Sequence, residues 1–334
     1  MGTDIYEILD TISESTQEMV LATIVNVDGS SYKKAGSTML FHEDGVQTGL
    51  LSGGCLEEDL KERCKEYFHQ KGSTLITYDL TAEDDLSWGQ GVGCNGTIKV
   101  LIESITPELM SHLKKVRELT NHGISVSYIK QLSLEGDVYG YLFYTENAEY
   151  FGQWKGDFPQ KEKWQSEAIR MENDYLLFKQ EIQARPRLFI YGAGADARPL
   201  AQLAQQSGYG VIVADWRPAY CHKDYFPSAT ETVVRSPEEF LSSYTFTTSD
   251  SIVLMTHHFQ KDLELVKYLL KKQLSYLGIL GSKDRAQRLL QGKKVQDWVH
   301  SPVGLSIGAE GPHEIAVSIV AELIEQKARR CVNV

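Results

Sequence analysis

Cys55 stands where a reactive thiol is expected in this chain. It follows Gly53 and Gly54 and opens a segment whose apolar residues have the spacing of an amphipathic helix. Glycine-rich backbone at a helix N-terminus forms a concavity that binds anions, and the positive end of the helix lowers the pKa of a thiol there. Such a thiolate can attack an electrophile or bind a soft metal ion. The alternative is a small buried residue, a common environment for a free cysteine.

Two further segments carry groups suited to an anionic ligand. Cys94 lies in a glycine-rich loop at 88–96, for which the alternative interpretation is a simple connection between strands. Lys33 and Lys34 follow two serines in a turn-prone segment that suits a phosphate group, whereas a solvated pair of surface lysines is the ordinary alternative. The N-terminal half thus holds two thiols next to glycines and a pair of cations.

The C-terminal half contains the pattern of a dinucleotide-binding turn. A G-x-G-x-x-A run follows an apolar strand and opens a helix, and an acid ends the next strand; the residues are Gly192, Gly194, Ala197 and Asp215. The first glycine permits the turn, the second lets a pyrophosphate approach, and the alanine lets the helix pack closely on the strand. Asp215 would bind the adenosine ribose of NAD, although Arg217 leaves NADP open. The alternative is a domain that keeps this fold and binds another ligand or none.

The elements that position these residues suggest an α/β chain with an N-terminal mixed α/β domain at 1–150, a linker at 151–185 and a Rossmann-like domain at 186–330. In the last part, apolar strands alternate with helices, which predicts a doubly wound parallel sheet. We expect helices at 3–16, 55–70, 107–121, 195–207, 237–243, 260–272, 282–291 and 311–328. Strands are expected at 19–27, 37–42, 73–80, 97–103, 187–191, 209–214, 251–255 and 276–280, with a hairpin near 124–145.

Composition excludes several classes of partner and site. The formal net charge of −11 argues against binding to nucleic acid or to anionic lipid. No apolar stretch reaches the ~20 residues of a membrane helix, and the N-terminal segment lacks the pattern of a signal peptide, so we expect a cytoplasmic protein. Five irregularly spaced cysteines predict free thiols, and the absence of CxxC and HExxH leaves a structural zinc site without support.

Several segments together resemble the XdhC/CoxI-like accessory factors of xanthine dehydrogenases. The similarity extends over nearly the whole chain and keeps the order of the family's motifs. The segments that carry it are GSSYKKAGSTM at 29–39, LLSGGCLEEDL at 50–60, WGQGVGCNG at 88–96, THHFQKD at 256–262, YLGILGSKDRAQRL at 276–289 and SPVGLSIGAEGPHEIAVSIVAEL at 301–323.

The resemblance implies a maturation factor rather than a metabolic dehydrogenase. Family members bind the molybdenum cofactor (molybdopterin), protect it while its sulfurated form is made, and deliver it to apo-xanthine dehydrogenase or a related molybdenum hydroxylase. A cysteine desulfurase and a second copy of this chain are the further partners that we consider. The alternative functions are an NAD(P)-dependent oxidoreductase and a docking protein whose Rossmann-like domain only presents a surface to the dehydrogenase.

The resemblance also assigns roles to individual residues. Cys55 matches the cysteine of the family's S-G-G-C-L-E motif and is our first choice for contact with the cofactor and its metal. Lys33 matches the lysine of a K-x-x-G motif. Cys94 lies in the family's glycine- and cysteine-rich loop. Some relatives carry adjacent cysteines there, whereas this chain reads Val92-Gly93-Cys94, so the resemblance does not imply a two-thiol clamp within that loop.

Two residues after an apolar strand are candidates for catalysis. His257 and Asp262 match a T-H-x-x-x-x-D element of the family, at the edge of the sheet where ligands of α/β proteins bind. In an oxidoreductase, His257 is the histidine placed to act as proton donor. The alternative is a loop histidine that hydrogen-bonds the backbone.

Overall fold

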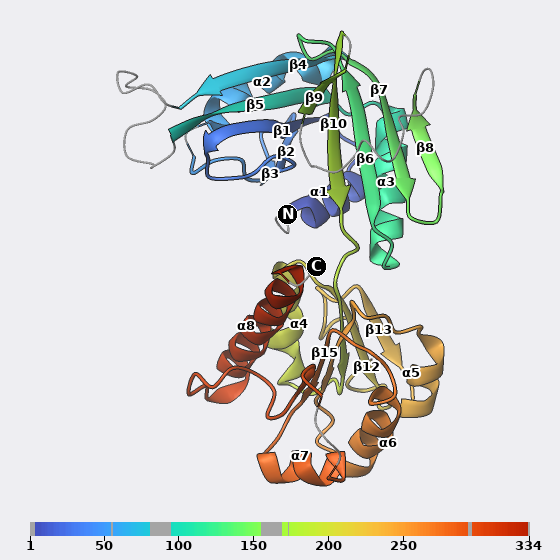
Figure 1. Ribbon diagram of the computed structural model, residues 1–334. Helices are drawn as coiled ribbons and strands as arrows, with labels where there is room; N and C mark the ends of the chain where they lie inside the picture. The colour runs from blue at the N-terminus through green and yellow to red at the C-terminus, as the bar shows by residue number, and fades with distance from the viewer. Residues whose placement is uncertain are drawn as a thin grey trace. The chain divides into compact units, whose positions relative to one another are not determined.

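The computed structural model describes residues 4–54, 56–80, 95–154, 169–172, 174–292 and 296–332. The chain divides into two compact units, an N-terminal unit at Met1–Ala184 and a C-terminal unit at Arg185–Val334. Each unit has its own sheets and helices (Figure 1). The expected fold class is confirmed, because the N-terminal unit contains antiparallel sheets with helices and the C-terminal unit contains a parallel sheet.

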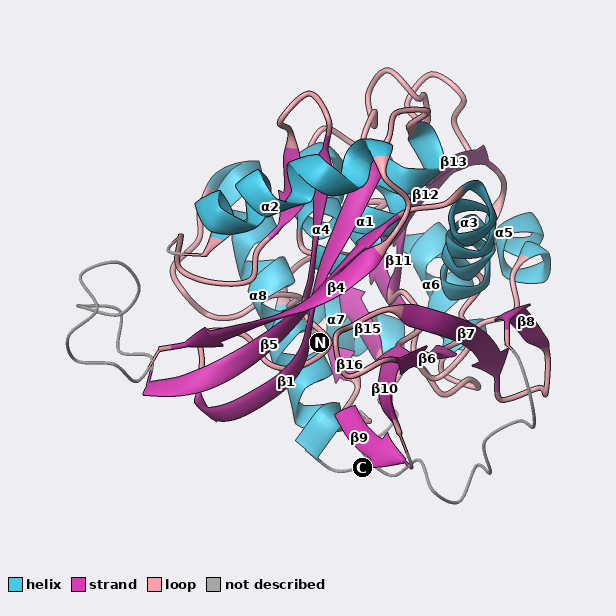
Figure 2. Ribbon diagram, turned by 90° about the horizontal axis from the view of Figure 1, so that it is seen from above, coloured by secondary structure: helices cyan, strands magenta, loops and turns pink. Residues whose placement is uncertain are grey.

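The first sheet of the N-terminal unit is antiparallel, and β1, β5 and β4 lie side by side in it as long twisted strands (Figure 2). Its order in the described residues is β3 (Gln47–Gly49), β2 (Thr38–His42), β1 (Met19–Ser30), β5 (Asn95–Ser104) and β4 (Ser73–Asp79). Helix α2 (Glu57–His69) covers one face of this sheet and α1 (Asp4–Glu14) covers the other. Alternate residues of β1 therefore enter two different apolar clusters, as the pleat of a strand requires.

A second antiparallel sheet completes the N-terminal unit. Its order in the described residues is β8 (Tyr150–Gln153), β7 (Val138–Thr145), β6 (Val126–Leu132), β10 (Tyr175–Ile182) and β9 (Ile169–Glu172). Helix α3 (Pro107–Asn121) packs on it. Thr106 caps this helix by accepting a hydrogen bond from the Leu109 N–H, and Pro107 occupies the first turn, where its missing N–H costs nothing.

The expected linker at 151–185 is wrong for its second part. Residues 175–182 form β10, which lies between β6 and β9 and pairs with β6 from Leu176 to Ile182. Leu176, Phe178 and Ile182 are buried, because alternate side chains of the strand face an apolar cluster. The N-terminal unit therefore extends to residue 184 and includes both strands that follow the polar segment.

The two sheets of the N-terminal unit are joined by buried polar contacts. The Lys130 ammonium on β6 contacts the Glu103 carboxylate on β5, and both side chains are almost fully buried. The turn between β6 and β7 lies directly against β4, where a Cβ on Gly136 would fall 2.1 Å from the Leu75 backbone nitrogen. Only glycine fits this approach.

The C-terminal unit is a parallel sheet covered on both faces by helices. Its order in the described residues is β13 (Glu231–Val234), β12 (Gly210–Asp215), β11 (Arg187–Tyr191), β14 (Ser251–Leu254), β15 (Tyr276–Ile279) and β16 (Val299–His300). Helices α4 (Ala197–Gln206) and α8 (Gly311–Val332) cover one face, and α5 (Pro237–Ser243), α6 (Phe259–Leu269) and α7 (Lys283–Leu290) cover the other. The chain crosses from one side of β11 to the other at β14, the point where α/β folds bind ligands.

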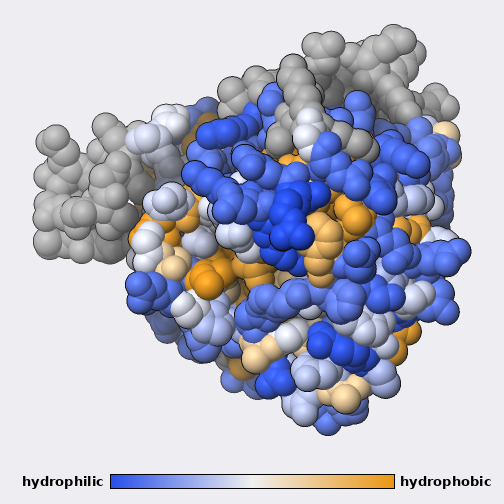
Figure 3. Space-filling view, turned by 90° about the horizontal axis from the view of Figure 1, so that it is seen from below, coloured by the Kyte–Doolittle hydropathy of each residue, from blue (hydrophilic) through white to orange (hydrophobic). Residues whose placement is uncertain are grey.

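The surface of the molecule agrees with the composition. On the face shown in Figure 3, hydrophilic side chains predominate and hydrophobic ones form small separate groups. None of the described helices combines the length and the apolar character that crossing a membrane requires.

Candidate functional site

The loop before α2 folds around one carboxylate. Glu57 is the first residue of α2, and its side chain accepts hydrogen bonds from the backbone N–H groups of Ser52 at 2.7 Å, Leu56 at 3.2 Å and Leu51 at 3.3 Å. The Ser52 hydroxyl donates a further hydrogen bond to it. The carboxylate is buried, so these donors replace water around the charge.

The surroundings of Glu57 favour the ionised form of its carboxylate. Burial alone would raise the pKa of Glu57, but the hydrogen bonds from Ser52 and the neighbouring amides hold it below its ordinary value of 4.5. A carboxylate in the first turn also complements the helix dipole. The ionised carboxylate of Glu57 therefore holds the loop in place through hydrogen bonds from the backbone of the loop.

The glycines of this loop face outward. Gly53 and Gly54 are exposed, and Gly54 has a φ of +110°, which favours glycine. Among the described residues other than Gly54 and its neighbours, no atom lies within 4 Å of the position that a Cβ of Gly54 would take. Cys55 lies outside the described residues, but Gly54 and Leu56 on either side donate hydrogen bonds to the Ser52 side chain at 3.1 and 3.2 Å.

The turn that carries Lys33 is tied to the sheets. Lys33 is half-buried, and its carbonyl accepts a hydrogen bond from the Ser31 hydroxyl. The Gly36 carbonyl accepts a hydrogen bond at 2.7 Å from the side chain of Gln180 on β10, and the Gly36 N–H donates one at 2.7 Å to the Ile24 carbonyl. The turn is thus a fixed part of the N-terminal unit.

The 31–37 turn, the 50–56 loop and the start of β5 lie toward the same end of the first sheet, although Ser30, opposite the start of β5, stands seven residues along β1 beyond Thr23, the partner of Thr38. The turn at 31–37 joins the end of β1 to the start of β2, and the loop at 50–56 follows the end of β3, where Gly49 pairs with Met39. Ser30 pairs with Asn95, the first residue of β5, so the segment that contains Cys94 enters the sheet at this end as well. Cys94 itself lies outside the described residues.

The glycine turn of the C-terminal unit contains an acidic side chain. A Cβ on Gly192, whose φ is +115°, would lie 2.5 Å from the Met255 backbone, so the turn crosses the end of β14 closely. A Cβ on Gly194 would lie 2.6 Å from Oδ1 of Asp196, and Oδ2 of Asp196 lies 2.8 Å from Nε2 of His257. A carboxylate thus lies where the dinucleotide pattern expects phosphate to approach.

The other two residues of the dinucleotide-binding pattern, Ala197 and Asp215, are buried. Ala197 packs in the apolar cluster under α4. The Asp215 carboxylate accepts hydrogen bonds at 2.8 to 2.9 Å from the Ala193 N–H, the Arg217 N–H and the Arg217 guanidinium. Burial alone would raise the pKa of Asp215, but these bonds hold it below its ordinary value. Both carboxylate oxygens are engaged within the chain, which does not fit a role in binding an adenosine ribose.

The two catalytic candidates have structural partners. His257 is largely exposed, has a φ of +56° and pairs with Asp196. Asp262 is buried, accepts a hydrogen bond at 2.5 Å from the Thr256 hydroxyl and pairs at 2.6 Å with Arg285. Asp262 therefore ties the end of β14 to α6 and α7.

Sequence reasoning missed the roles of Ser52 and Glu57. Glu57 has the position of an ordinary acid in the first turn of a helix, and its spacing of five residues from Ser52 is the one signal that a loop closes on it. Within the described ranges, no group of three or more His, Cys, Asp or Glu side chains is placed to hold a metal ion.

Comparison with known proteins places this architecture in a family. The model of the XdhC and CoxI family matches residues 13–79, the BH1974-like central domain matches 107–183, and the XdhC Rossmann domain matches 188–323. The chain is 45% identical over 328 residues to a probable xanthine dehydrogenase subunit of Bacillus subtilis (strain 168), covering 97% of this chain and 98% of the relative. This chain belongs to the XdhC and CoxI family.

Two more relatives of this XdhC-family protein are informative. The molybdenum cofactor insertion chaperone PaoD of Escherichia coli (strain K12) is 23% identical over 315 residues, which cover 91% of this chain and 82% of PaoD. A crystal structure of a xanthine dehydrogenase (BH1974) from Bacillus halodurans matches with a TM-score of 0.85 and 46% identity, over 99% of this chain and 97% of that one. The match of the central domain ends at residue 183, directly after β10, which is the last strand of the second sheet along the chain.

Proposed function

We propose that this XdhC-family protein binds the molybdenum cofactor and delivers it to a molybdenum hydroxylase of the xanthine dehydrogenase type. The observation that carries the proposal is that the 31–37 turn, the 50–56 loop and the start of β5 all lie toward the end of the first sheet at which β1 ends. The names of two relatives, a molybdenum cofactor insertion chaperone and a probable xanthine dehydrogenase subunit, support it.

The chemistry of these segments suits the proposed cargo. A thiolate at Cys55 would supply a soft ligand to molybdenum. The exposed backbone of Gly53 and Gly54 and the side chain of Lys33 suit the phosphate of the pterin. Cys94, in the segment before β5, is the second thiol in the proposal. Glu57 holds the loop from inside and acts as a positioning residue.

The proposed partners follow from the cargo. The recipient is an apo-molybdenum hydroxylase in the cytoplasm, and a cysteine desulfurase would supply sulfur to the bound cofactor. A second copy of the chain completes the proposed assembly. The proposed function does not include the binding of a dinucleotide, because the contacts of Asp215 and Asp196 do not fit one.

Reconstitution tests the role of the thiol. Purified protein is incubated with molybdenum cofactor and desalted, and the retained molybdenum and pterin are measured by mass spectrometry and fluorescence. We expect Cys55→Ala to retain at least fivefold less of both. Cys64→Ala is the matched control, since burial raises the pKa of the Cys64 thiol to about 12 and keeps it protonated inside the unit.

Two different negative results test the role of the thiol and the binding of the cofactor separately. If Cys55→Ala retains as much cofactor as the wild type, the thiol is not part of the site. If the wild-type protein retains neither molybdenum nor pterin, cofactor binding itself is refuted.

A further inference from the structure

Helix α8 carries an apolar stripe along its outer side. Val317 and Ile324 are 50% and 49% exposed, which is unusual for large apolar side chains on a helix that also packs on a sheet. Ala321 and Ala328 complete the row, so that the four residues follow one another at intervals of four, three and four. This spacing aligns side chains on one side of a helix, as in the seam of a coiled coil.

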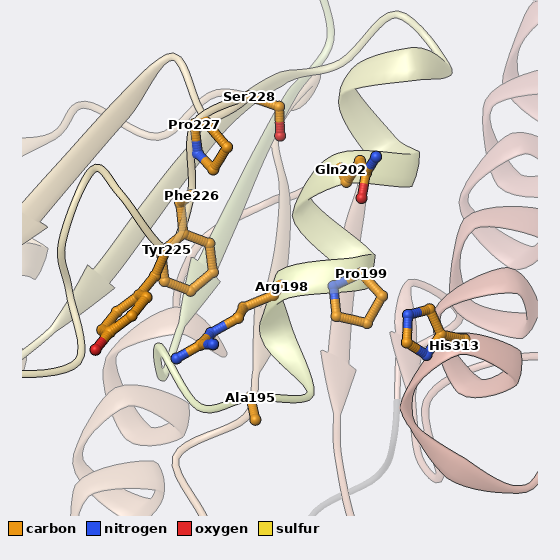
Figure 4. A pocket seen from close by; sticks show the side chains of 9 residues that line it. All are labelled: Ala195, Arg198, Pro199, Gln202, Tyr225, Phe226, Pro227, Ser228 and His313. Atoms are coloured by element: carbon orange, nitrogen blue, oxygen red, sulfur yellow. The ribbon is translucent and has the colours of Figure 1, made fainter.

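The stripe does not belong to the interior of the C-terminal unit. The opposite side of α8 supplies the buried residues, which are Ala316, Ile319, Val320 and Leu323. One flank of the helix lies beside α4, where His313 of α8 and Pro199 of α4 line the same pocket (Figure 4). The apolar stripe therefore lies between that flank and the opposite one, on the side that faces away from the sheet.

Charged residues of opposite sign border the two ends of the stripe. Glu314 precedes Ala321 by seven residues and Arg329 follows it by eight, and both are exposed. The 3.6-residue repeat of a helix places Glu314 and Arg329 on the same flank, the one away from α4. These charges also suit the dipole of α8 itself, so they define the direction of a partner helix only in combination with the apolar stripe.

The stripe and its charges are complementary to a second copy of α8 that runs antiparallel. If the two helices cross at Ala321, each Val317 meets an Ile324 of the other copy, and the small alanine lets the helices approach closely. A two-fold axis brings the same flank of both helices together. Each Glu314 then lies beside an Arg329 of the other copy, so that both ends of the seam join opposite charges.

We propose that α8 is the interface between two copies of this chain, which pack as an antiparallel pair about Ala321. The inference rests on the second copy in the proposed function and names the surface that it covers, but it does not require that cofactor is bound. An interface built on one helix pair is small among specific interfaces. The association is therefore reversible and depends on protein concentration.

Sedimentation velocity of the full-length protein without cofactor tests the interface. Over concentrations from about 1 to about 100 µM, where small interfaces dissociate, we expect the dimer fraction to rise with concentration. Ile324→Glu should weaken the association at least tenfold, because it places a charge in the apolar seam. Leu134→Glu is the matched control, since Leu134 is 52% exposed in the turn between β6 and β7.

Two results would overturn the proposal. A wild-type chain that stays monomeric over the whole range would show that this face is covered by another protein or by none. An Ile324→Glu variant that associates like the wild type would place the interface elsewhere. Neither result depends on the reconstitution of Cys55→Ala, because the sedimentation samples contain no cofactor.

Charge exchange tests the antiparallel direction. We expect Glu314→Arg and Arg329→Glu each to weaken self-association at least fivefold, because both contacts at the ends of the seam then join like charges. An equimolar mixture of the two variants should associate as well as the wild type, since both contacts in the mixed dimer again join opposite charges. If the mixture associates no better than the separate variants, the antiparallel pairing is wrong.

A change of charge on another exposed helix provides the control. Lys65 on α2 pairs with Glu62 within its helix, as Arg329 pairs with Glu325 within α8. Lys65→Glu therefore makes the same change in net charge and removes a similar surface ion pair. We expect it to leave the dimer fraction unchanged, and a loss as large as that in Arg329→Glu would attribute the effect to net charge and overturn the assignment to α8.

Discussion

Glu57 shows how one side chain can fix the conformation of the loop at 50–56. Its carboxylate accepts hydrogen bonds from residues before and after the two glycines, so the chain on both sides of Cys55 is held by the same group. A buried carboxylate with this many donors is costly to neutralise, because each donor would lose its acceptor. Protonation of Glu57 is therefore coupled to the conformation of the loop.

We expect Glu57→Gln to lower the free energy of unfolding by about 1–3 kcal/mol at neutral pH, the usual cost of leaving buried donors unsatisfied. Because the folded-state pKa of Glu57 lies below its unfolded value of 4.5, its contribution is present above that pH and is lost as the pH falls through the folded pKa. Urea unfolding of both proteins between neutral pH and pH 3 measures this. The difference between them should shrink in acid, and a difference independent of pH would contradict the argument.

For single residues, the sequence predicted the place in the fold better than it predicted the side-chain contacts. Gly192 and Ala197 occupy the turn and the helix contact that their spacing indicated. The pairing of Asp215 with Arg217 could not be read from the sequence, because two residues that are neighbours at a strand end can face a ligand or each other. The side chain of Asp196 carried no signal, since it stands at a variable position of the motif.

Among the elements, those with local signals were predicted well. The expected helices at 107–121 and 237–243 have the observed bounds, because each begins with a proline after a capping Thr106 or Ser236. The strand β10 was missed, since its partner β6 lies more than 40 residues earlier and its pattern follows a polar segment. The edge strands β13 and β16 were also missed, because segments of four and two residues show no period.

The contact between Lys130 and Glu103 joins β6 to β5, and we expect Glu103→Gln to cost about 3–5 kcal/mol of unfolding free energy, since it leaves a buried charge without its partner. The double variant Glu103→Gln/Lys130→Met should recover part of this loss. Burial lowers the pKa of Lys130 to about 7, below its unfolded value of 10.5, so the unfolded chain binds more protons between these values. Removing the Glu103 carboxylate lowers the pKa of Lys130 further, so the stability of Glu103→Gln should rise with pH up to the unfolded value of 10.5.

Chemical denaturation of the wild type, both single variants and the double variant gives the coupling energy between the two side chains. A single variant that unfolds at the wild-type denaturant concentration would show that the contact contributes nothing. Equal losses in Glu103→Gln and in the double variant would mean that the uncompensated ammonium is not the cause.

For the whole molecule, the two units have separate interiors. In the described residues, each apolar cluster draws its members from one unit alone, and the boundary between Ala184 and Arg185 precedes the proline that starts the Rossmann part. From the sequence we expected a boundary at Arg185–Pro186, because a proline limits the conformation of the residue before it. It did not predict that the second sheet continues up to that point.

We expect a fragment of residues 185–334 to fold alone, because its clusters on both faces of the parallel sheet are complete without the N-terminal unit. Circular dichroism of the fragment should show helical signal and a single cooperative melting transition. The complementary fragment 1–184 provides the matched measurement. A fragment 185–334 that melts without cooperativity would show that its stability depends on the other unit.

The first sheet also separates what must stay constant from what can vary. The strands and the helices on both faces form the interior, and the 31–37 turn and the exposed Gly53 and Gly54 of the 50–56 loop lie toward the end of the sheet at which β1 ends. Exchanges at the exposed positions of these connections leave the packing of Leu51 and Leu56 in the interior untouched. Variants of this architecture can thus alter the surface at this end of the sheet without altering its interior, and a chimaera could take those exposed positions from another member of the family.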